Sequence, residues 1–175
     1  MIIILIMEYQ ELCLKSIDEF EVPKYNLGTY KVYTPNYVRY YIDGLLHREG
    51  GPAHIYVGRV TRTEKYYHMN ERHRDDGPAH IEYDIRGEKL IVRSTEYLQR
   101  NLFHRLNEPA RIFYNALGEK MDIQYWVNGE LHNERGPAVI YGPRQDFHRE
   151  EKYYLCGKRY PKEEWEKQIE TKLYW

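Results

Sequence analysis

The chain repeats itself, and this internal repeat constrains the fold more than any other feature. The segment YYIDGLLHREGGPAHIY begins at Tyr40, and a matching segment begins at Tyr66, with every equivalent position 26 residues further on. Further copies begin at Tyr97, Tyr125 and Tyr153, the last of which is partial. In the four full copies His precedes Pro by five residues, so differences in length fall between the units, where connecting turns absorb insertions. This pattern predicts stacked copies of one supersecondary unit.

Two columns of the repeat predict its turns. Four residues after the first Tyr come the residues of the first column, Gly44, Asn70, Asn101, Gly129 and Gly157. Gly and Asn tolerate the positive φ that a two-residue hairpin turn requires, so each unit is predicted to contain a strand, a tight turn and a second strand. The second column is Pro52, Pro78, Pro109 and Pro137. Because proline has no N–H to give to a ladder, this column predicts a second corner.

An Ala-x-Ile segment follows each proline and predicts a further strand. Its period of two places Ala and Ile on one face, which we expect to be packed. The position between them differs from copy to copy, and its members are His54, His80, Arg111 and Val139. We therefore expect the opposite face to tolerate change.

Three segments are predicted. Residues 1–35 form an N-terminal cap and possible dimerisation segment, residues 36–160 hold four full repeats and one partial repeat, and residues 161–175 form an amphipathic helix. Early acidic residues after Pro161 favour a helix N-terminus, and a helix there would cover the last hairpin. The apolar run Ile2–Met7 is too short and lacks the positive flank for a signal peptide or a membrane span. We expect a chain that is neither secreted nor transmembrane.

The predicted fold class is all-β, an elongated antiparallel β-hairpin repeat sheet with a short C-terminal capping helix and an N-terminal cap. The apolar residues include 19 Tyr and only 4 Phe, and tyrosine hydroxyls must reach water or a partner, which suits a thin sheet. The 26 basic and 27 acidic residues nearly cancel, so the composition does not indicate a nucleic-acid partner.

The histidine column raises the question of a metal site. Its members are His47, His73, His104 and His132. Equivalent histidines of a sheet with two or three strands per repeat lie roughly 10–14 Å apart. Ligands of one metal ion lie only about 4 Å from each other. We therefore expect a hydrogen-bonded structural column and no metal or other cofactor.

Catalysis is not expected either, although acidic residues lie close after some of these histidines, as in His47 with Glu49 and His73 with Asp75 and Asp76. A catalytic site is one constellation in one cleft, whereas this motif recurs along the chain. No phosphate-binding glycine loop or nucleophile motif is found. We therefore predict no catalytic residues.

Two other columns have two interpretations each. The aromatic column Tyr41, Tyr67, Trp126 and Tyr154 either packs between repeats or forms an exposed face that binds a partner. The arginines Arg48, Arg74 and Arg105 either meet phosphates of lipid or nucleic acid or form a solvated ladder of salt bridges with neighbouring carboxylates.

The copy YWVNGELHNERGPAVI from Tyr125 resembles MORN-type (membrane occupation and recognition nexus) repeats. It is closest to a variant, roughly W-x-x-N-G-x-x-H-R-x-D-G-P-A, that is abundant in giant DNA viruses such as the Marseilleviridae. The resemblance covers Tyr40 to about Trp165, although the units here are longer than the standard MORN repeat and lack its paired G-x-G. It implies a meandering sheet of stacked hairpins, no catalysis, scaffolding or partner binding, and dimers.

The resulting functional prediction is a non-enzymatic MORN-like scaffold for protein–protein interaction in a giant DNA virus. The expected partners are proteins, the first being a second copy in a homodimer formed through Ile2–Met7 or an open sheet edge. The expected location is the host cytoplasm or the virion. The alternative is a module that binds a membrane surface or a phosphoinositide, and a nucleic-acid partner is not expected.

Overall fold

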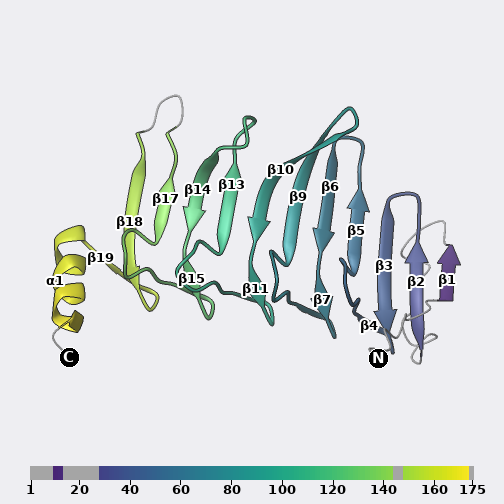
Figure 1. The fold of residues 1–175 in the computed structure, drawn as a ribbon, viewed down its shortest axis with the longest axis horizontal. Helices are drawn as coiled ribbons and strands as arrows, with labels where there is room; N and C mark the ends of the chain where they lie inside the picture. The colour runs from purple at the N-terminus through teal and green to yellow at the C-terminus, as the bar shows by residue number, and fades with distance from the viewer. Residues whose placement is uncertain (1–9, 14–27, 144–147, 174–175) are drawn as a thin grey trace, which may run out of the picture.

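The computed structural model describes residues 10–13, 28–143 and 148–173, and it contains one long single-layered sheet with one helix at its end (Figure 1). Along the sheet the strands are β1 (Gln10–Cys13), β2 (Thr29–Tyr33), β3 (Tyr37–Ile42), β5 (His54–Val57), β6 (Thr61–Lys65), β9 (His80–Arg86), β10 (Lys89–Glu96), β13 (Arg111–Tyr114), β14 (Lys120–Gln124), β17 (Val139–Tyr141), β18 (Glu150–Leu155) and β19 (Lys158–Tyr160). The thirteenth strand, β4 (Leu45–Leu46), pairs with β3. Every pairing is antiparallel except β1 with β2, so the predicted hairpin repeat sheet is confirmed.

Short hairpins lie along one margin of this sheet, below the long strands in Figure 1. Three of them form separate two-stranded sheets: β7 (Tyr67–His68) with β8 (Glu71–Arg72), β11 (Leu98–Gln99) with β12 (Leu102–Phe103), and β15 (Trp126–Val127) with β16 (Glu130–Leu131). The β3–β4 and β18–β19 hairpins occupy the same position in the first and last copies. Each of these five hairpins contains a turn that the repeat predicts.

The short turns have the predicted backbone. Asp43 and Gly44 have φ of 48° and 76°, and Asn128 and Gly129 have φ of 50° and 82°. Positive φ at both central residues is the mark of a type I′ hairpin turn. The remaining three copies show the same pair of positive values, at residues 69–70, 100–101 and 156–157. The Gly/Asn column is therefore explained by backbone sterics.

A second, longer hairpin in every full repeat lies outside the repeated motif. The Ala-x-Ile segments begin β5, β9, β13 and β17, and each returns along the next strand of the main sheet. The turns that join them differ in length and sequence, with Gly87 at φ 62° in one and Gly118 at φ 80° in another. These variable turns explain why the spacing between units changes while the spacing within them does not.

The packed face is the one predicted from the alanine column. Ala53, Ala79, Ala110 and Ala138 are fully buried. The isoleucines two positions on include Ile112, which is 3% exposed, and Ile81, which is 9% exposed. The main-chain N–H of the first tyrosine in each full copy donates to the alanine carbonyl, at 2.7–2.8 Å, which fixes the short hairpin to the strand that follows it.

The opposite face is not the permissive surface that the sequence indicates, and this expectation is wrong. Val139 is 3% exposed, and the His80 side chain is 12% exposed. Two side chains of the short hairpins reach this face: Phe103 lies 5.7 Å from the Arg111 guanidinium, and Arg72 lies 3.9 Å from the carboxylate of Glu96. The hairpins add cover that the alternation of the strand sequence does not show.

The C-terminal helix α1 spans Lys162–Leu173, within the predicted residues 161–175, the last two of which lie outside the described residues. It packs on β18 at the end of the sheet (Figure 1). Trp165 is 8% exposed, its ring lies 5.2 Å from that of Tyr153, and its Nε1 donates to the Asn133 carbonyl at 3.1 Å. The predicted capping helix is confirmed.

The N-terminal prediction is described in part. Of residues 1–35, the structure describes residues 10–13, which form β1, and residues 28–35, which include β2; among the described strands β1 is the last of the sheet. The predicted pairing segment Ile2–Met7 lies outside the described residues.

Candidate functional site

The repeat columns meet at the boundaries between successive repeats, where they form a ladder of recurring contacts. The turn residue of each copy from the second onward donates its N–H to a carbonyl of the preceding copy, as in Asn70 to Leu46 at 2.9 Å and Gly157 to Leu131 at 3.0 Å. Asn70 also accepts the Leu46 N–H through its Oδ1 at 2.7 Å, and Asn101 does the same for Arg72 at 2.9 Å. Asparagine therefore joins repeats as well as tolerating the turn.

The histidine column connects each repeat to the next. Nδ1 of His47, His104 and His132 accepts the main-chain N–H of the residue before the next turn residue, at 3.3, 3.1 and 3.0 Å. On the other side of the ring, Nε2 of His47 lies 2.9 Å from Glu49 and that of His132 lies 3.4 Å from Glu134. These partners require a neutral ring with its proton on Nε2. His73 differs, because its buried Nδ1 has no hydrogen-bond partner among the described residues.

The arginine column forms salt bridges with neighbouring carboxylates at two of its three positions, Arg74 with Asp76 and Arg105 with Glu108, and it also makes a contact that was not predicted. The guanidinium carbons of Arg48, Arg74 and Arg105 lie 3.9, 4.0 and 3.8 Å from the ring centres of Tyr40, Tyr66 and Tyr97, the first tyrosines of the same copies. Each guanidinium also donates to the carbonyl of the column proline, at 3.3–3.4 Å. Cation–π stacking and this hydrogen bond close the loop between histidine and proline.

In the first two copies the Arg–Tyr stack leaves little room beside the glycine that precedes the proline, whereas the third copy has the same stack and carries Glu108 there. A Cβ added at Gly51 would lie 3.0 Å from the Arg48 guanidinium carbon, and one at Gly77 would lie 2.9 Å from that of Arg74. The fourth copy carries Asn133 in place of arginine, and there the amide donates to the Pro137 carbonyl at 3.0 Å. The same loop is closed without the stack.

Grooves open at three successive boundaries, with volumes of about 620, 390 and 570 Å³. The first groove lies between Arg48 and Tyr67, the second between Arg74 and Tyr97, and the third between Arg105 and Tyr125. Arginines and carboxylates line them together, so none carries a single sign of charge. Leu106 lines both the second and the third groove and is 64% exposed.

The aromatic column does not form one continuous exposed face. Tyr41 is only 5% exposed, so the proposed binding role of this residue is wrong. Trp126 stacks on Phe103 at 5.3 Å and donates to Gln124 at 3.1 Å, whereas Tyr67 lines the first groove. Tyr154 is half-buried. Members of this one column therefore have different roles: some pack against neighbouring side chains, and Tyr67 lines a groove.

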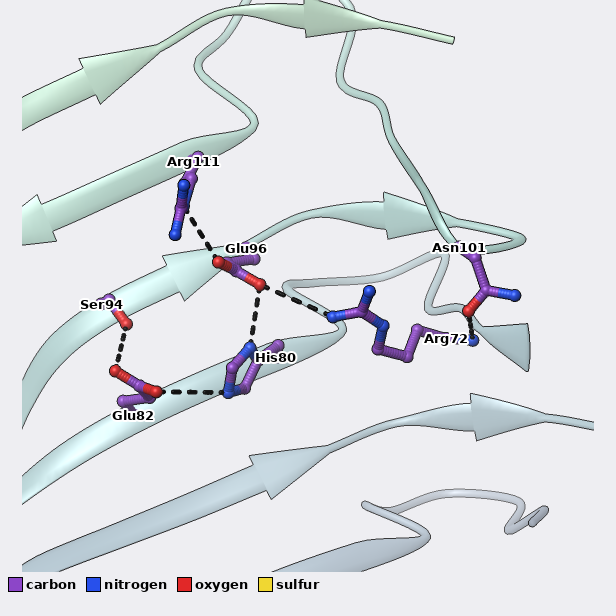
Figure 2. A network of polar contacts seen from close by, with 7 residues as sticks. All are labelled: Arg72, His80, Glu82, Ser94, Glu96, Asn101 and Arg111. Carbon is purple, nitrogen blue, oxygen red and sulfur yellow. Dashed lines mark hydrogen bonds and ion pairs between the residues drawn. The ribbon is translucent and has the colours of Figure 1, made fainter. Parts of the chain in front are cut away.

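A polar network that the sequence did not predict lies between the second and third repeats, on the face of the sheet opposite the alanine column (Figure 2). Glu96 is 7% exposed and lies at its centre. Its carboxylate contacts His80 Nδ1 at 2.9 Å, Arg111 Nε at 3.0 Å and Arg72 Nη1 at 3.9 Å. Glu82 lies beside it, accepting from the Ser94 hydroxyl at 3.1 Å.

Charge compensation decides the protonation of Glu96. Burial by itself would raise the pKa of this carboxyl, but the hydrogen bond from His80 and the positive charges around it outweigh burial and lower the pKa. The carboxylate is therefore ionised and bonded on several sides. This arrangement stabilises the contact between β9, β10 and β13 and resembles a structural polar core more than a reactive centre.

The network was missed because its members come from different columns. His80 and Arg111 occupy the variable position of the Ala-x-Ile segment, while Glu96 immediately precedes a repeat tyrosine. The one signal in the sequence is that Glu96 stands where the other copies carry Arg39, Lys65, Gln124 and Lys152. Only the strand register places it between the two basic side chains.

Comparison with known proteins gives no relative: no protein-family model matches the chain, and no curated protein or solved structure does. Within residues 10–13, 28–143 and 148–173, no helix is long and apolar enough to cross a membrane.

Proposed function

We propose that this chain is a non-enzymatic scaffold that binds a protein partner along its row of inter-repeat grooves, and that it is a MORN-like repeat protein of a giant DNA virus. The observation that carries the proposal is the recurrence of one groove type at successive boundaries. An extended segment of a partner can contact several such grooves at once. Repeat proteins commonly present their binding surfaces in this way.

The column side chains support a structural use of the repeat. The histidines connect neighbouring copies, and the arginines are stacked on tyrosines and bonded to proline carbonyls. Groups committed to these contacts are poorly placed to move protons or to act as nucleophiles. This argument favours binding over catalysis.

The same contacts weaken the alternative of phosphoinositide binding, because they engage the arginines that were expected to bind phosphate. Arg48, Arg74 and Arg105 each face a tyrosine ring and a carbonyl, and Arg74 also pairs with Asp76 at 2.6 Å. A homodimer remains part of the proposal, since among the described residues β1 is the last strand of the sheet and a second chain could pair with its free side.

Leu106 offers a test of groove binding that spares the fold. Leu106→Asp places a charge in two grooves at a side chain that is already exposed, so we expect the chain to fold normally and to lose its protein partner. The measurement is affinity capture from host lysate, comparing proteins recovered by the wild type and by the variant.

Leu117→Asp is the matched control, because Leu117 is 83% exposed and lies in the turn between β13 and β14, away from the grooves. Loss of a partner with the first variant and its retention with the second supports the proposal. Equal recovery by both variants contradicts it. Size-exclusion chromatography with light scattering of the same samples tests the homodimer separately.

A further inference from the structure

One histidine departs from the repeat and lies beside a repeat histidine of the neighbouring copy. His68 is an exposed residue of β7, at a position where the other copies carry Ile42, Gln99, Val127 and Leu155. Its ring centre lies 4.7 Å from that of His47 and 6.2 Å from that of His73. The spacing argument against a shared metal applies to equivalent histidines, and His68 is not equivalent to His47.

These rings form a three-residue donor set with a carboxylate. One ligand atom each from His47, Glu49 and His68 lies within 4.8 Å of the others. Imidazole nitrogens and carboxylate oxygens bind Zn²⁺ at about 2.0–2.2 Å, and two histidines with one glutamate are a known zinc donor set. We propose that His47, Glu49 and His68 bind one Zn²⁺ ion at the boundary between the first and second repeats.

The burial of the three side chains suits this role. His47 is 5% exposed and fixed in place, while Glu49 and His68 are exposed and free to adjust. Ligand atoms of a tetrahedral zinc site lie about 3.3 Å apart, so the two exposed side chains need to move by only about 1 Å. Glu49 and His68 both line the first groove, which supplies space for water in the fourth position.

Binding at Nε2 replaces two hydrogen bonds of His47: the one to Glu49 at 2.9 Å, whose two groups both become ligands, and the longer one from the Met69 N–H. Metal at Nδ1 of His47 displaces the Met69 N–H directly, whereas metal at Nε2 leaves the ring proton on Nδ1, where it faces the same N–H. At 3.3 Å this bond is longer than the equivalent bonds of His104 and His132, at 3.1 and 3.0 Å. The contact between His47 and Glu49 becomes a shared bond to the ion.

We expect one Zn²⁺ ion per chain, because each of the other boundaries between described repeats lacks at least one of the three ligands. His73 and Asp75 form an equivalent pair, but the next copy carries Gln99 at the position of His68; His132 and Glu134 form another, and the copy after them carries Leu155 there. His104 is followed two residues later by Leu106 and has no carboxylate there. Within the described residues the complete donor set occurs once, and its ion joins two repeats.

The experiment is calorimetric titration of ZnCl₂ into the full-length chain, purified without a histidine tag. We expect one saturable site. His68→Gln introduces the residue type found at the equivalent position of the next repeat, and we expect at least a tenfold loss of affinity. One equivalent of Zn²⁺ should raise the thermal midpoint of the wild type and leave that of this variant unchanged.

His148→Gln controls for the loss of an exposed histidine outside the cluster, and we expect it to bind as the wild type does. Circular dichroism of each variant establishes that it is folded before titration. Absence of a saturable site in the wild type overturns the proposal. Affinity of the His68→Gln variant within twofold of the wild type overturns it as well.

Discussion

His54 and His80 occupy the same position in successive repeats, each after Gly-Pro-Ala; both pair with Lys65, but the neighbour on the other side is basic for His54 and acidic for His80. His54 pairs with Arg39 on one side and Lys65 on the other, and its buried Nε2 has no hydrogen-bond partner among the described residues. His80 pairs with Lys65 and with Glu96, to which it bonds at 2.9 Å. Burial, with the charges of Arg39 and Lys65, lowers the pKa of His54 to about 4.

The comparison shows that a repeat sets the position of a side chain without setting its chemistry. The deciding neighbour is the residue before the next repeat tyrosine, which the motif leaves variable. Lys65 at one boundary and Glu96 at the next are enough to change an uncompensated basic cluster into a closed ionic network. Electrostatic differences along the sheet thus arise from single positions.

The largest expected effect comes from removing the carboxylate charge that distinguishes the two boundaries. Glu96→Gln leaves Arg111 and Arg72 without their counter-ion in a partly buried site, so we expect unfolding to require about 2–3 kcal/mol less free energy. Urea unfolding followed by circular dichroism measures this. Glu82→Gln, at a carboxylate whose side chain is 41% exposed, is the control and should cost less. A loss no greater than that of the control would remove Glu96 from the centre of the network.

The second effect is a pH dependence that arises at His54. Its pKa is about 4 in the folded chain, whereas the ordinary pKa of histidine is 6.5, so between these values the unfolded chain binds a proton that the folded chain does not. The free energy of unfolding should therefore fall as the pH decreases from 6.5 towards 4. His54→Gln should flatten this dependence when urea unfolding is compared at about pH 7 and about pH 5. An unchanged slope would place the pH dependence elsewhere.

The smallest expected change in stability comes from Lys65, which stands at the position that Glu96 occupies in the next copy. Lys65→Glu places a carboxylate opposite His54, as Glu96 lies opposite His80, and should raise the pKa of His54 from its lowered value. The change in stability should be below about 1 kcal/mol because Lys65 is only half-buried. An NMR titration of the His54 ring measures the pKa. Lys65→Gln removes the positive charge alone and should give a smaller rise, and equal rises would show that the new carboxylate does not reach the ring.

Much of the fold could be predicted because the short hairpins depend on local physics. Gly44, Asn70 and Gly129 predict their turns because Gly and Asn tolerate the positive φ that these turns have, which few other residues do. The alternation of Ala and Ile marks the packed face, and Pro161 marks the start of the final helix. The second hairpin of each unit was not predicted, because its turns and return strands vary in sequence and length.

The residues of the candidate site were likewise predicted only in part. The histidine column was visible as a column, but the acceptor role of His47 towards Met69 depends on how closely two repeats stack. Two of the arginines pair with neighbouring carboxylates, as one of the two predictions held. Their stacking on Tyr40, Tyr66 and Tyr97 was not predicted, because it depends on how each loop folds back over its own tyrosine. Tyr41 belongs to the aromatic column, yet the packing around it buries this residue.

By itself, the sequence determined the repeat, the position of each tight turn and the face that carries alanine, because these depend on backbone sterics and strand alternation within one unit. The tertiary structure decided which unlike columns meet: Glu96 with His80 and Arg111, and His68 with His47. Those meetings depend on strand register and on the stacking of successive hairpins. Both depend on residues far apart in the sequence. Residues at variable positions of the repeat do not recur from copy to copy, so the repeat pattern cannot predict their contacts.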